Sequence, residues 1–217
     1  MDKKYWDHYY VKHGQDREIN LHSSFAEFCV DKFFLNKKLN IVEIGSGNGR
    51  DAIYFAHHNH KVYAIDQSVT AIEIEKSHIS DNISRNLIPI ASDFIKTNFS
   101  FNDAIDVFYS RFTLHAISKK DEDILLPKIY NSLVNGGLFC IEVRTVNDPL
   151  FGKGKYCDKN TFLIDHRRRF IESSVFLEQM LSLGFSLLFF TEEDDLSIYK
   201  DDNPVLMRII LKKSIAI

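Results

Sequence analysis

Short apolar runs alternate with stretches of helical periodicity along most of the chain. Turn residues bound these runs, as is typical of strands in a covered sheet. They predict five strands, at Asn40–Ile44, Lys61–Ile65, Leu87–Ala91, Ile105–Tyr109 and Leu138–Val143. Because helical patterns fill the gaps between them, the alternation predicts an α/β fold with a mostly parallel sheet.

The helices between these strands are predicted at Gly49–His57, Val69–Ser80 and Asp121–Leu133, and another at Ser174–Leu183 follows the fifth strand. After that helix the pattern changes, because two further strands follow closely at Phe185–Thr191 and Pro204–Lys212. The acidic segment between them, TEEDDLSIYKDDN, is too short for a crossover helix, so it predicts an antiparallel hairpin. The whole sheet is therefore expected to have seven strands, with the last one antiparallel.

Two segments outside this alternation are expected to wall a ligand pocket. Helical patterns at Lys3–Lys12 and His22–Phe34 precede the first strand and form an expected N-terminal helical lid over residues 1–36. The long segment Thr145–Phe170 is rich in Lys, Arg and Gly, and long loops in compact domains are often functional. We expect residues 145–171 to be a substrate loop insertion in a single domain over residues 1–217.

Composition narrows the setting in which the protein works. The chain is 45% hydrophobic and 26% charged, with no apolar stretch long enough to cross a bilayer. Its polar N-terminus lacks a signal-peptide pattern, and Cys29, Cys140 and Cys157 lack metal-site spacing, so we expect free thiols in the cytoplasm. The formal charge of −3 argues against nucleic-acid and membrane partners and favours a small-molecule substrate. The oligomeric state stays open.

A glycine-rich turn follows the first strand in IVEIGSGNGRDA. Gly45, Gly47 and Gly49 alternate there, which lets a ligand approach the backbone, and the following helix offers unpaired N–H groups. A dinucleotide-binding fingerprint would place its third glycine at position 50, which is Arg50. The spacing therefore favours a different nucleotide-like cofactor.

Carboxylates stand at the ends of the next two strands. Asp66 ends the second strand, where it can accept hydrogen bonds from both hydroxyls of a ribose. Asp93 ends the third strand, where it can meet the amino group of an adenine, and Phe94 is next to it for ring contact. Solvated strand ends or helix caps are the plain structural alternative for both acids.

In combination these motifs resemble the class I methyltransferases that use S-adenosylmethionine, from residue 39 to residue 212. The resemblance implies a Rossmann-like fold, an antiparallel last strand, S-adenosylmethionine as cofactor and S-adenosylhomocysteine as product. It implies that Glu43 orders the glycine turn, that Gly45 to Gly49 pack beside the methionine moiety and that Asp66 holds the ribose. The residues expected at the cofactor are Glu43, Gly45, Ser46, Gly47, Asn48, Gly49, Asp66, Gln67, Asp93, Phe94, Ser110, Trp6 and Ser24.

The acceptor is expected to be a small molecule. Methyltransferases of nucleobase amino groups typically carry a Pro-Pro-aromatic motif after the fourth strand, where this chain reads YSRFTLHAIS. Catalytic roles are expected for His115, Arg111, Glu142 and Arg144. Substrate binding is expected from Tyr10, Arg111, Arg144, His166, Arg168 and Arg169. Such a basic cluster suits a phosphate or carboxylate, because guanidinium forks bind those anions through two hydrogen bonds.

The chemistry of the acceptor decides whether a base is needed. An anionic phosphate or phosphoramidate oxygen needs none, and His115 would then donate a hydrogen bond. A sugar hydroxyl must lose its proton, and His115 or Glu142 would then be the base.

Several of these residues also fit a purely structural role. Trp6, Tyr9 and Tyr10 have the helical spacing of residues that dock a helix on a core, and His115 fits a satisfied interior histidine.

Charged residues have similar alternatives. Glu142 and Arg144 point to the same strand face and can pair with each other, and the arginines at 167–169 fit a solvated loop. The tract HHNH, at 57–60, is typical of a surface helix end, and no metal site is expected.

Six stretches resemble a narrower group, the methyltransferases encoded with bacterial surface-polysaccharide pathways. They are YWDHYY, SSFAEF, GSGNGRDA, SRFTLHAI, EVRT and DHRRRFI. Ser23 and Arg167 depart from that group, which is expected to have a proline and an aromatic residue there. The resemblance implies O-methylation of a phosphoramidate or phosphate group in capsular polysaccharide biosynthesis. O-methylation of a sugar hydroxyl or small carboxylate, and a non-catalytic S-adenosylmethionine-binding module, are the alternatives.

Overall fold

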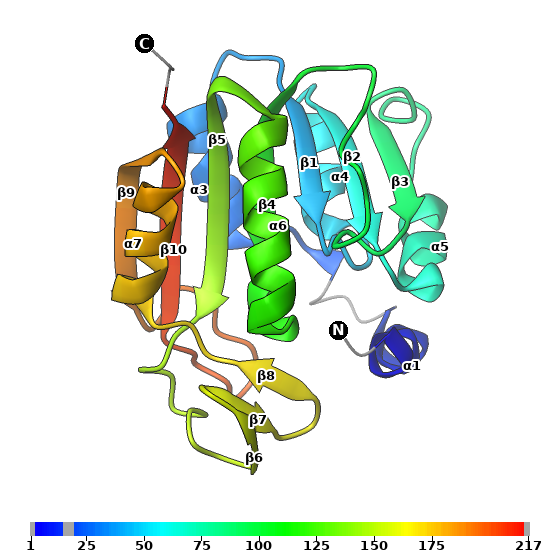
Figure 1. Ribbon diagram of the computed structural model, residues 1–217. Helices are drawn as coiled ribbons and strands as arrows, with labels where there is room; N and C mark the ends of the chain where they lie inside the picture. Colours follow the sequence, from blue (N-terminus) through cyan, green and yellow to red (C-terminus); the bar gives the residue numbers. More distant parts are fainter. Residues whose placement is uncertain (1–2, 15–19, 215–217) are drawn as a thin grey trace.

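The computed structural model describes residues 3–14 and 20–214, and its centre is a seven-stranded sheet (Figure 1). The strands are β1 (Asn40–Ile44), β2 (Lys61–Asp66), β3 (Leu87–Ala91), β4 (Ile105–Arg111), β5 (Leu133–Arg144), β9 (Phe185–Glu193) and β10 (Leu206–Lys213). They lie in the order β3-β2-β1-β4-β5-β10-β9. Pairing is parallel from β3 through β5, whereas β10 is antiparallel to both β5 and β9, which confirms the predicted sheet and its terminal hairpin.

Helices cover both faces of this sheet. They are α1 (Lys3–His13), α3 (Ser24–Cys29), α4 (Arg50–His57), α5 (Val69–Ser77), α6 (Lys119–Ser132) and α7 (Ser173–Ser182), with a π-helical turn η1 (Val30–Phe34) and a 3-10 turn η2 (Leu114–Ala116). In one buried cluster Leu125 of α6 and Phe176 of α7 pack on the sheet. In the other, Phe25 of α3 and Phe55 of α4 pack on the opposite face. The apolar helix faces therefore meet the sheet as their spacing predicts.

Some element boundaries differ from the prediction for local reasons. The helix expected from His22 begins at Ser24 because Ser23 caps it, accepting a hydrogen bond from the Ala26 N–H at 3.1 Å. β5 begins at Leu133, ahead of the predicted start, because the strand accommodates Gly136 with a φ of 80°. Gly136 and Gly137, a pair that usually favours a turn, are therefore part of this strand.

The segment expected to be a long loop contains a second sheet. Its antiparallel strands are β6 (Lys155–Asp158), β7 (Thr161–Leu163) and β8 (Arg167–Arg169). The segment begins and ends at one place, since Thr145 forms a β-bridge with Ile171. The insertion is thus a small folded unit, and side chains along β8 alternate between two faces.

The carboxyl ends of β1, β2, β4 and β5 meet at one edge of the large sheet, where α1 lies on one side and β6–β8 on the other (Figure 1). Open parallel sheets bind ligands at this edge. Residues 1–2 and 15–19 of the expected lid lie outside the described residues. None of the helices in the described ranges has the length and apolar character that crossing a bilayer requires.

Candidate functional site

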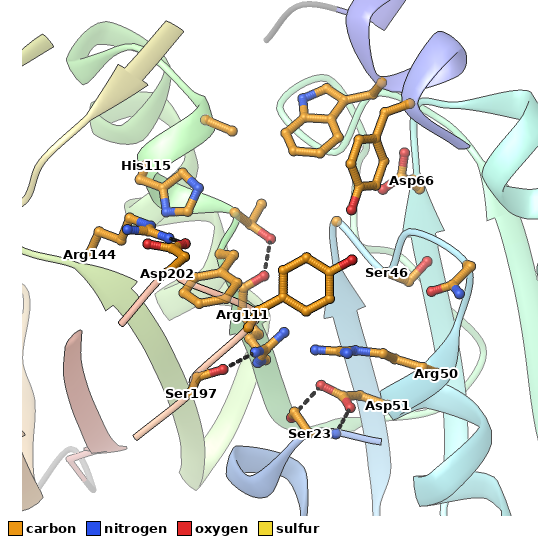
Figure 2. A pocket seen from close by; sticks show the side chains of 18 of the residues that line it. Ser23, Ser46, Arg50, Asp51, Asp66, Arg111, His115, Arg144, Ser197 and Asp202 are labelled. Carbon is orange, nitrogen blue, oxygen red and sulfur yellow. Dashed lines mark hydrogen bonds and ion pairs between the residues drawn. The ribbon is translucent and has the colours of Figure 1, made fainter. Parts of the chain in front are cut away.

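A cavity of about 770 Å³ opens at the carboxyl edge of the sheet (Figure 2). The glycine turn and Asp66 bound one end, and His115, Arg144 and Asp202 bound the other, with Arg111 between them. Further walls come from α1, from the β7–β8 turn and from the hairpin turn, residues 194–205, that joins β9 to β10. One space therefore connects the expected cofactor residues with the expected acceptor residues.

The glycine turn has a backbone that side chains would strain. Gly45, Gly47 and Gly49 have φ values of 71°, 58° and 78°, in the left-handed region that favours glycine. A Cβ atom on Gly47 would collide with the hydroxyl of Tyr10, and one on Gly45 with the side chain of Thr113. The turn is therefore a backbone cradle that Tyr10 of α1 and Thr113 approach closely.

Asp66 lines the cavity beside that cradle and helps to shape it. Its Oδ2 accepts the Gly47 N–H at 3.0 Å, and its Oδ1 accepts the Ser68 N–H at 2.8 Å. Burial raises the pKa of this carboxyl above its ordinary value, while the two backbone hydrogen bonds counteract that rise. Each oxygen still has a lone pair for a ligand hydroxyl.

Glu43 supplies a buried acceptor at the same end. Its Oε2 has no hydrogen-bond partner among the described residues, although the side chain is buried. Burial, followed by the charges of Asp51 and Glu75, raises the pKa of Glu43 well above its ordinary value. A buried carboxyl without a donor is costly, so a ligand that brings a hydroxyl or ammonium donor to this atom is favoured.

Six expected cofactor residues do not belong to the described cavity lining: Gly47, Gly49, Gln67, Asp93, Phe94 and Ser110. Phe94 has no exposed surface and packs in the core, so its side chain has no free face for a ligand ring. Asp93 accepts the Ile95 N–H at 3.0 Å in the turn that follows β3, and no helix of the described chain begins there for it to cap. Gln67 Nε2 and Ser110 Oγ are buried and have no hydrogen-bond partner within the described part of the chain.

The first helix is tied to both ends of the site. Ser68 Oγ donates to Asp7 Oδ1 at 2.6 Å, and the Tyr5 hydroxyl donates to Asp165 Oδ2 at 2.9 Å. Trp6 lines the cavity between these contacts. Trp6, Tyr9 and Tyr10 thus wall the cavity, while the hydrogen bonds of Asp7 and Tyr5 hold the helix in place.

Glu142 lies away from the cavity and holds two arginines. Its Oε1 is 2.7 Å from Arg111 Nε, and its Oε2 accepts from Arg208 Nε at 2.6 Å. Arg111 in turn donates to Ser197 Oγ at 2.7 Å. This geometry does not support Glu142 as a base or as the partner of Arg144, because both of its oxygens are already engaged by other guanidiniums.

Arg144 presents its guanidinium to the cavity between two carboxylates. Nη1 donates to Asp148 Oδ2 at 2.9 Å, and Nη2 donates to Asp202 Oδ2. Phe112 lies between the two guanidiniums, with its ring centre 4.3 Å from Cζ of Arg111 and 5.8 Å from Cζ of Arg144. The two expected arginines are therefore fixed in place and stacked on one ring.

The expected histidines gather at the same end. Burial, followed by the nearby charges of Arg168 and Arg144, holds the pKa of His115 well below its ordinary value of 6.5, so the ring is neutral at physiological pH. His115 Nδ1 and Arg168 Nε are buried without a hydrogen-bond partner in the described ranges. His166 Nδ1 lies 3.1 Å from Asp165 Oδ1.

Strand alternation sorts the three arginines of β8. Arg168 lines the cavity, whereas Arg169 faces the opposite side, where its Nε donates to the Ile117 carbonyl at 3.2 Å and it pairs with Glu122. Arg167 is exposed. The expected substrate-binding role of Arg169 is therefore wrong for this geometry, because neighbouring strand residues point to opposite faces.

The hairpin turn supplies cavity residues that sequence reasoning missed. Ser197 and Asp202 line the cavity and contact its arginines. Ser24, expected at the cofactor, lines the cavity too; it donates to the Leu196 carbonyl at 2.9 Å and accepts from Arg208 Nη2 at 2.8 Å. The available signal was the length of the acidic segment, which exceeds what a tight hairpin turn requires.

A second missed group lies below the glycine turn. Asp51 accepts the Ser23 N–H at 2.7 Å and the Tyr109 hydroxyl at 2.8 Å. Burial alone would raise the pKa of Asp51, but the charges of Arg50 and Arg111 and the hydrogen bonds from Ser23 outweigh it, and the pKa is lowered. Asp51 and Ser23 themselves line the cavity, and their contacts join α3, α4 and β4 at its wall.

Comparisons with known proteins agree with this fold. The family described as "Methyltransferase domain" matches residues 41–137. O-methyltransferase 3 of Dictyostelium discoideum is 28% identical over 165 residues, which cover 70% of this chain and 38% of that protein. The chain thus spans well under half the length of this relative.

Solved structures show the same fold at low identity. A methyltransferase dependent on S-adenosylmethionine from Methanosarcina mazei has a TM-score of 0.70 at 14% identity, covering 86% of this chain and 98% of that one. The 1,6-didemethyltoxoflavin-N1-methyltransferase of Burkholderia thailandensis, solved with its substrate and S-adenosylhomocysteine, has a TM-score of 0.69 at 16% identity, covering 98% and 88%.

Proposed function

We propose that this chain, which has the class I methyltransferase fold, is an S-adenosylmethionine-dependent methyltransferase that transfers a methyl group to an oxygen of a small anionic acceptor. The observation that carries the proposal is the single cavity that joins the glycine turn to the cluster of Arg111, His115, Arg144 and Arg168. In finer terms, we propose a phosphoramidate or phosphate acceptor in capsular polysaccharide biosynthesis in the cytoplasm, supported by the sequence resemblance to methyltransferases of surface-polysaccharide pathways.

The residues at the first end of the cavity fit the cofactor. The glycine turn offers backbone groups to the methionine part of the cofactor. Glu43 Oε2, which has no donor among the described residues, can accept from its amino group, and the lone pairs of Asp66 can accept from its ribose hydroxyls. S-adenosylmethionine supplies an activated methyl group, so the chain has to hold, orient and dehydrate the reactants. Trp6 and Tyr10 of α1 lie over this end and exclude water from it.

The residues at the second end fit an anion. Arg111 and Arg144 are held by carboxylates behind them, so their guanidiniums are oriented before a ligand arrives. Arg168 Nε and His115 Nδ1 are buried hydrogen-bonding atoms that a phosphoryl or carboxylate oxygen can satisfy. An anionic oxygen is already nucleophilic, so this scheme requires positioning and no proton removal.

A hydroxyl acceptor is the second candidate, because His115 is neutral and its Nδ1 is unpaired within the described residues. Those are the properties of a general base. We predict that His115→Ala abolishes turnover of a hydroxyl acceptor but only weakens turnover of an anionic one. Steady-state kcat and KM with each acceptor measure the difference, and total loss on an anionic acceptor contradicts the scheme without a base.

The test of the proposal is S-adenosylhomocysteine release with mass detection of the methylated product. The acceptors are nucleoside diphosphate-linked phosphoramidates, simple phosphates, sugar nucleotides and small carboxylates. Turnover of the phosphoryl compounds alone supports the finer proposal. Turnover of sugar hydroxyls or carboxylates alone contradicts the phosphoryl acceptor and keeps the enzyme class, while cofactor binding without any turnover favours a non-catalytic module.

We also propose a division of labour along the chain. Residues 1–36 act as a lid and residues 145–171 as a substrate insertion within a single domain, supported by the contact between Tyr5 and Asp165 that joins them. The substrate is a small molecule, in keeping with a cavity bounded on several sides.

A further inference from the structure

We infer that Asp202 is an internal counter-ion that holds the place of the acceptor's negative charge, so that the site selects an acceptor group carrying one negative charge. The inference rests on the proposed function, since it concerns the acceptor end of the same cavity. It goes further by naming the charge of the acceptor group and a residue that sets it.

The two carboxylates on Arg144 differ in how easily they can leave. Asp148 is four residues along the chain, and its side chain is 0% exposed, so it is a fixed partner. Asp202 belongs to the hairpin turn, and its side chain is 42% exposed. Water can replace the contacts of Asp202 but not those of Asp148, so an incoming anion displaces Asp202 at the lower cost.

Two polar atoms near Asp202, on Arg168 and His115, have no hydrogen-bond partner among the described residues, Asp202 included. They are the buried atoms Arg168 Nε and His115 Nδ1, and both residues line the same end of the cavity. Figure 2 places His115, Arg144 and Asp202 together at this end. A group with two or more oxygens can bind Arg144 and reach these atoms as well, which one aspartate does not do.

The charges at the acceptor end indicate how much charge the ligand brings. The guanidiniums there belong to Arg111, Arg144, Arg168 and Arg208. The carboxylates paired with them belong to Glu142, Asp148, Asp165 and Asp202. Within these ion pairs the charges balance while Asp202 is in place, and its departure leaves the set with one excess positive charge. A monoanion restores the balance, whereas a dianion buries an uncompensated charge.

The experiment measures anion binding to the protein saturated with S-adenosylhomocysteine, by isothermal titration at constant ionic strength. The probes are dimethyl phosphate and acetate, which are monoanions, and methyl phosphate, which is a dianion at about pH 8. Asp202→Asn removes the internal competitor. Asp201→Asn is the matched control, since it removes the same charge from a neighbouring exposed residue outside the described cavity lining.

We expect the wild-type protein to bind a monoanion more tightly than methyl phosphate. Asp202→Asn should lower the dissociation constant of that monoanion about tenfold, as expected if Asp202 occupies the site roughly 90% of the time. Asp201→Asn should leave it unchanged. If dimethyl phosphate binds more tightly than acetate, the acceptor is a phosphoryl group, and the reverse order indicates a carboxylate. Arg144→Gln should abolish anion binding and leave the affinity for S-adenosylhomocysteine unchanged.

The inference is overturned if Asp202→Asn does not tighten monoanion binding, if it binds none of the probes, or if methyl phosphate binds best. Equal tightening by Asp201→Asn overturns it too, since the effect would then be a general one of loop charge. Failure of the proposed function looks different, because the wild-type protein would then not bind S-adenosylhomocysteine at all. Unfolding curves show that each variant is folded.

Discussion

At the scale of single residues, Glu142 is a buried carboxylate that forms ion pairs with two arginines. It lies between Arg111 and Arg208 and has no exposed surface. Each of these arginines also donates a hydrogen bond to the hairpin turn. Arg111 donates to Ser197 Oγ, and Arg208 donates to the Leu196 carbonyl. Glu142 therefore reaches the cavity through Arg111, which lines it.

Replacing this carboxylate should reveal its structural role. We predict that Glu142→Gln lowers the free energy of unfolding by about 3 kcal/mol, because it leaves two buried guanidiniums without their shared anion. Urea denaturation measures the loss. Glu178→Gln changes an exposed glutamate on α7 and should fall within about 0.5 kcal/mol of wild type. Equal stabilities for the two variants would contradict the assignment.

His60 gives the protein a dependence of stability on pH. It closes the tract at 57–60 but is buried, and its Nδ1 accepts the Leu39 N–H at 3.3 Å. Burial, followed by the charge of His58, lowers its pKa from 6.5 to about 4. Between these pH values the unfolded chain binds more protons than the folded one, so stability falls as the pH drops through this window. His115 acts in the same direction, since its pKa is also lowered.

We predict that His60→Gln flattens the fall in the free energy of unfolding between about pH 6.5 and about pH 4. His57→Gln, at an exposed position of the same tract, should keep the wild-type slope. Chemical denaturation at a series of pH values gives both slopes. Identical slopes for wild type and His60→Gln would show that another group carries the dependence.

At the scale of elements, β8 shows how three neighbouring arginines acquire three roles. The strand turns Arg168 into the cavity and Arg169 towards Glu122 of α6, while Arg167 is exposed. Arg169 also donates to the carbonyls of Leu114 and Ile117, so it holds η2, the turn that carries His115.

Glutamine substitutions along β8 should separate these roles. We predict that Arg168→Gln raises the KM for the acceptor about tenfold or more, because it removes a charge-assisted contact. Arg169→Gln should instead lower the free energy of unfolding, because it removes the guanidinium that pairs with the buried Glu122. Arg167→Gln should change neither quantity. Steady-state kinetics and urea denaturation of all three variants test the alternation, and an acceptor effect at Arg167 would contradict it.

The seven strands of the large sheet could be predicted because their apolar runs are long and bounded by turns. The strands of the insertion could not, because β7 and β8 are each three residues long and β8 is entirely basic. The glycine turn and Asp66 were predictable for a related reason, since their geometry is local.

Glu142 and Phe94 were not predictable in the same way. Both stand where a strand or its end suggests a site residue, but long-range packing decides where the side chain points. The partners of Glu142 come from β4 and β10, and Phe94 turns into the core. Sequence position gave the edge of the sheet, whereas tertiary contacts selected the residues that face the ligand.

At the scale of the whole molecule, α1 and the insertion meet across the mouth of the cavity. The Tyr5 hydroxyl bonds Asp165, and the rings of Trp6 and His166 lie 5.2 Å apart. Asp7 holds the same helix to Ser68, the N-cap of α5. A ligand in the cavity therefore contacts parts that are remote in sequence, and its binding should tie them together.

Limited proteolysis tests this closure. We predict that S-adenosylhomocysteine slows cleavage within residues 145–170 severalfold, because the cofactor holds α1 in place and α1 holds the insertion. Tyr5→Phe removes the hydroxyl that bonds Asp165 and should lose part of the protection. Val11→Ala, at an exposed position of α1, is the control and should keep it. Unchanged cleavage with and without the cofactor would contradict the closure.

The way β10 is held has a consequence for how new specificities arise. It pairs with β5 on one side and β9 on the other, so both ends of the hairpin turn are anchored by ladders of backbone hydrogen bonds. Insertions and replacements between these anchors leave the sheet, and with it the cofactor end, untouched. Descendants of one ancestral chain can thus diverge in what they bind at the other end of the cavity by exchanging this one segment, while inheriting the glycine turn unchanged.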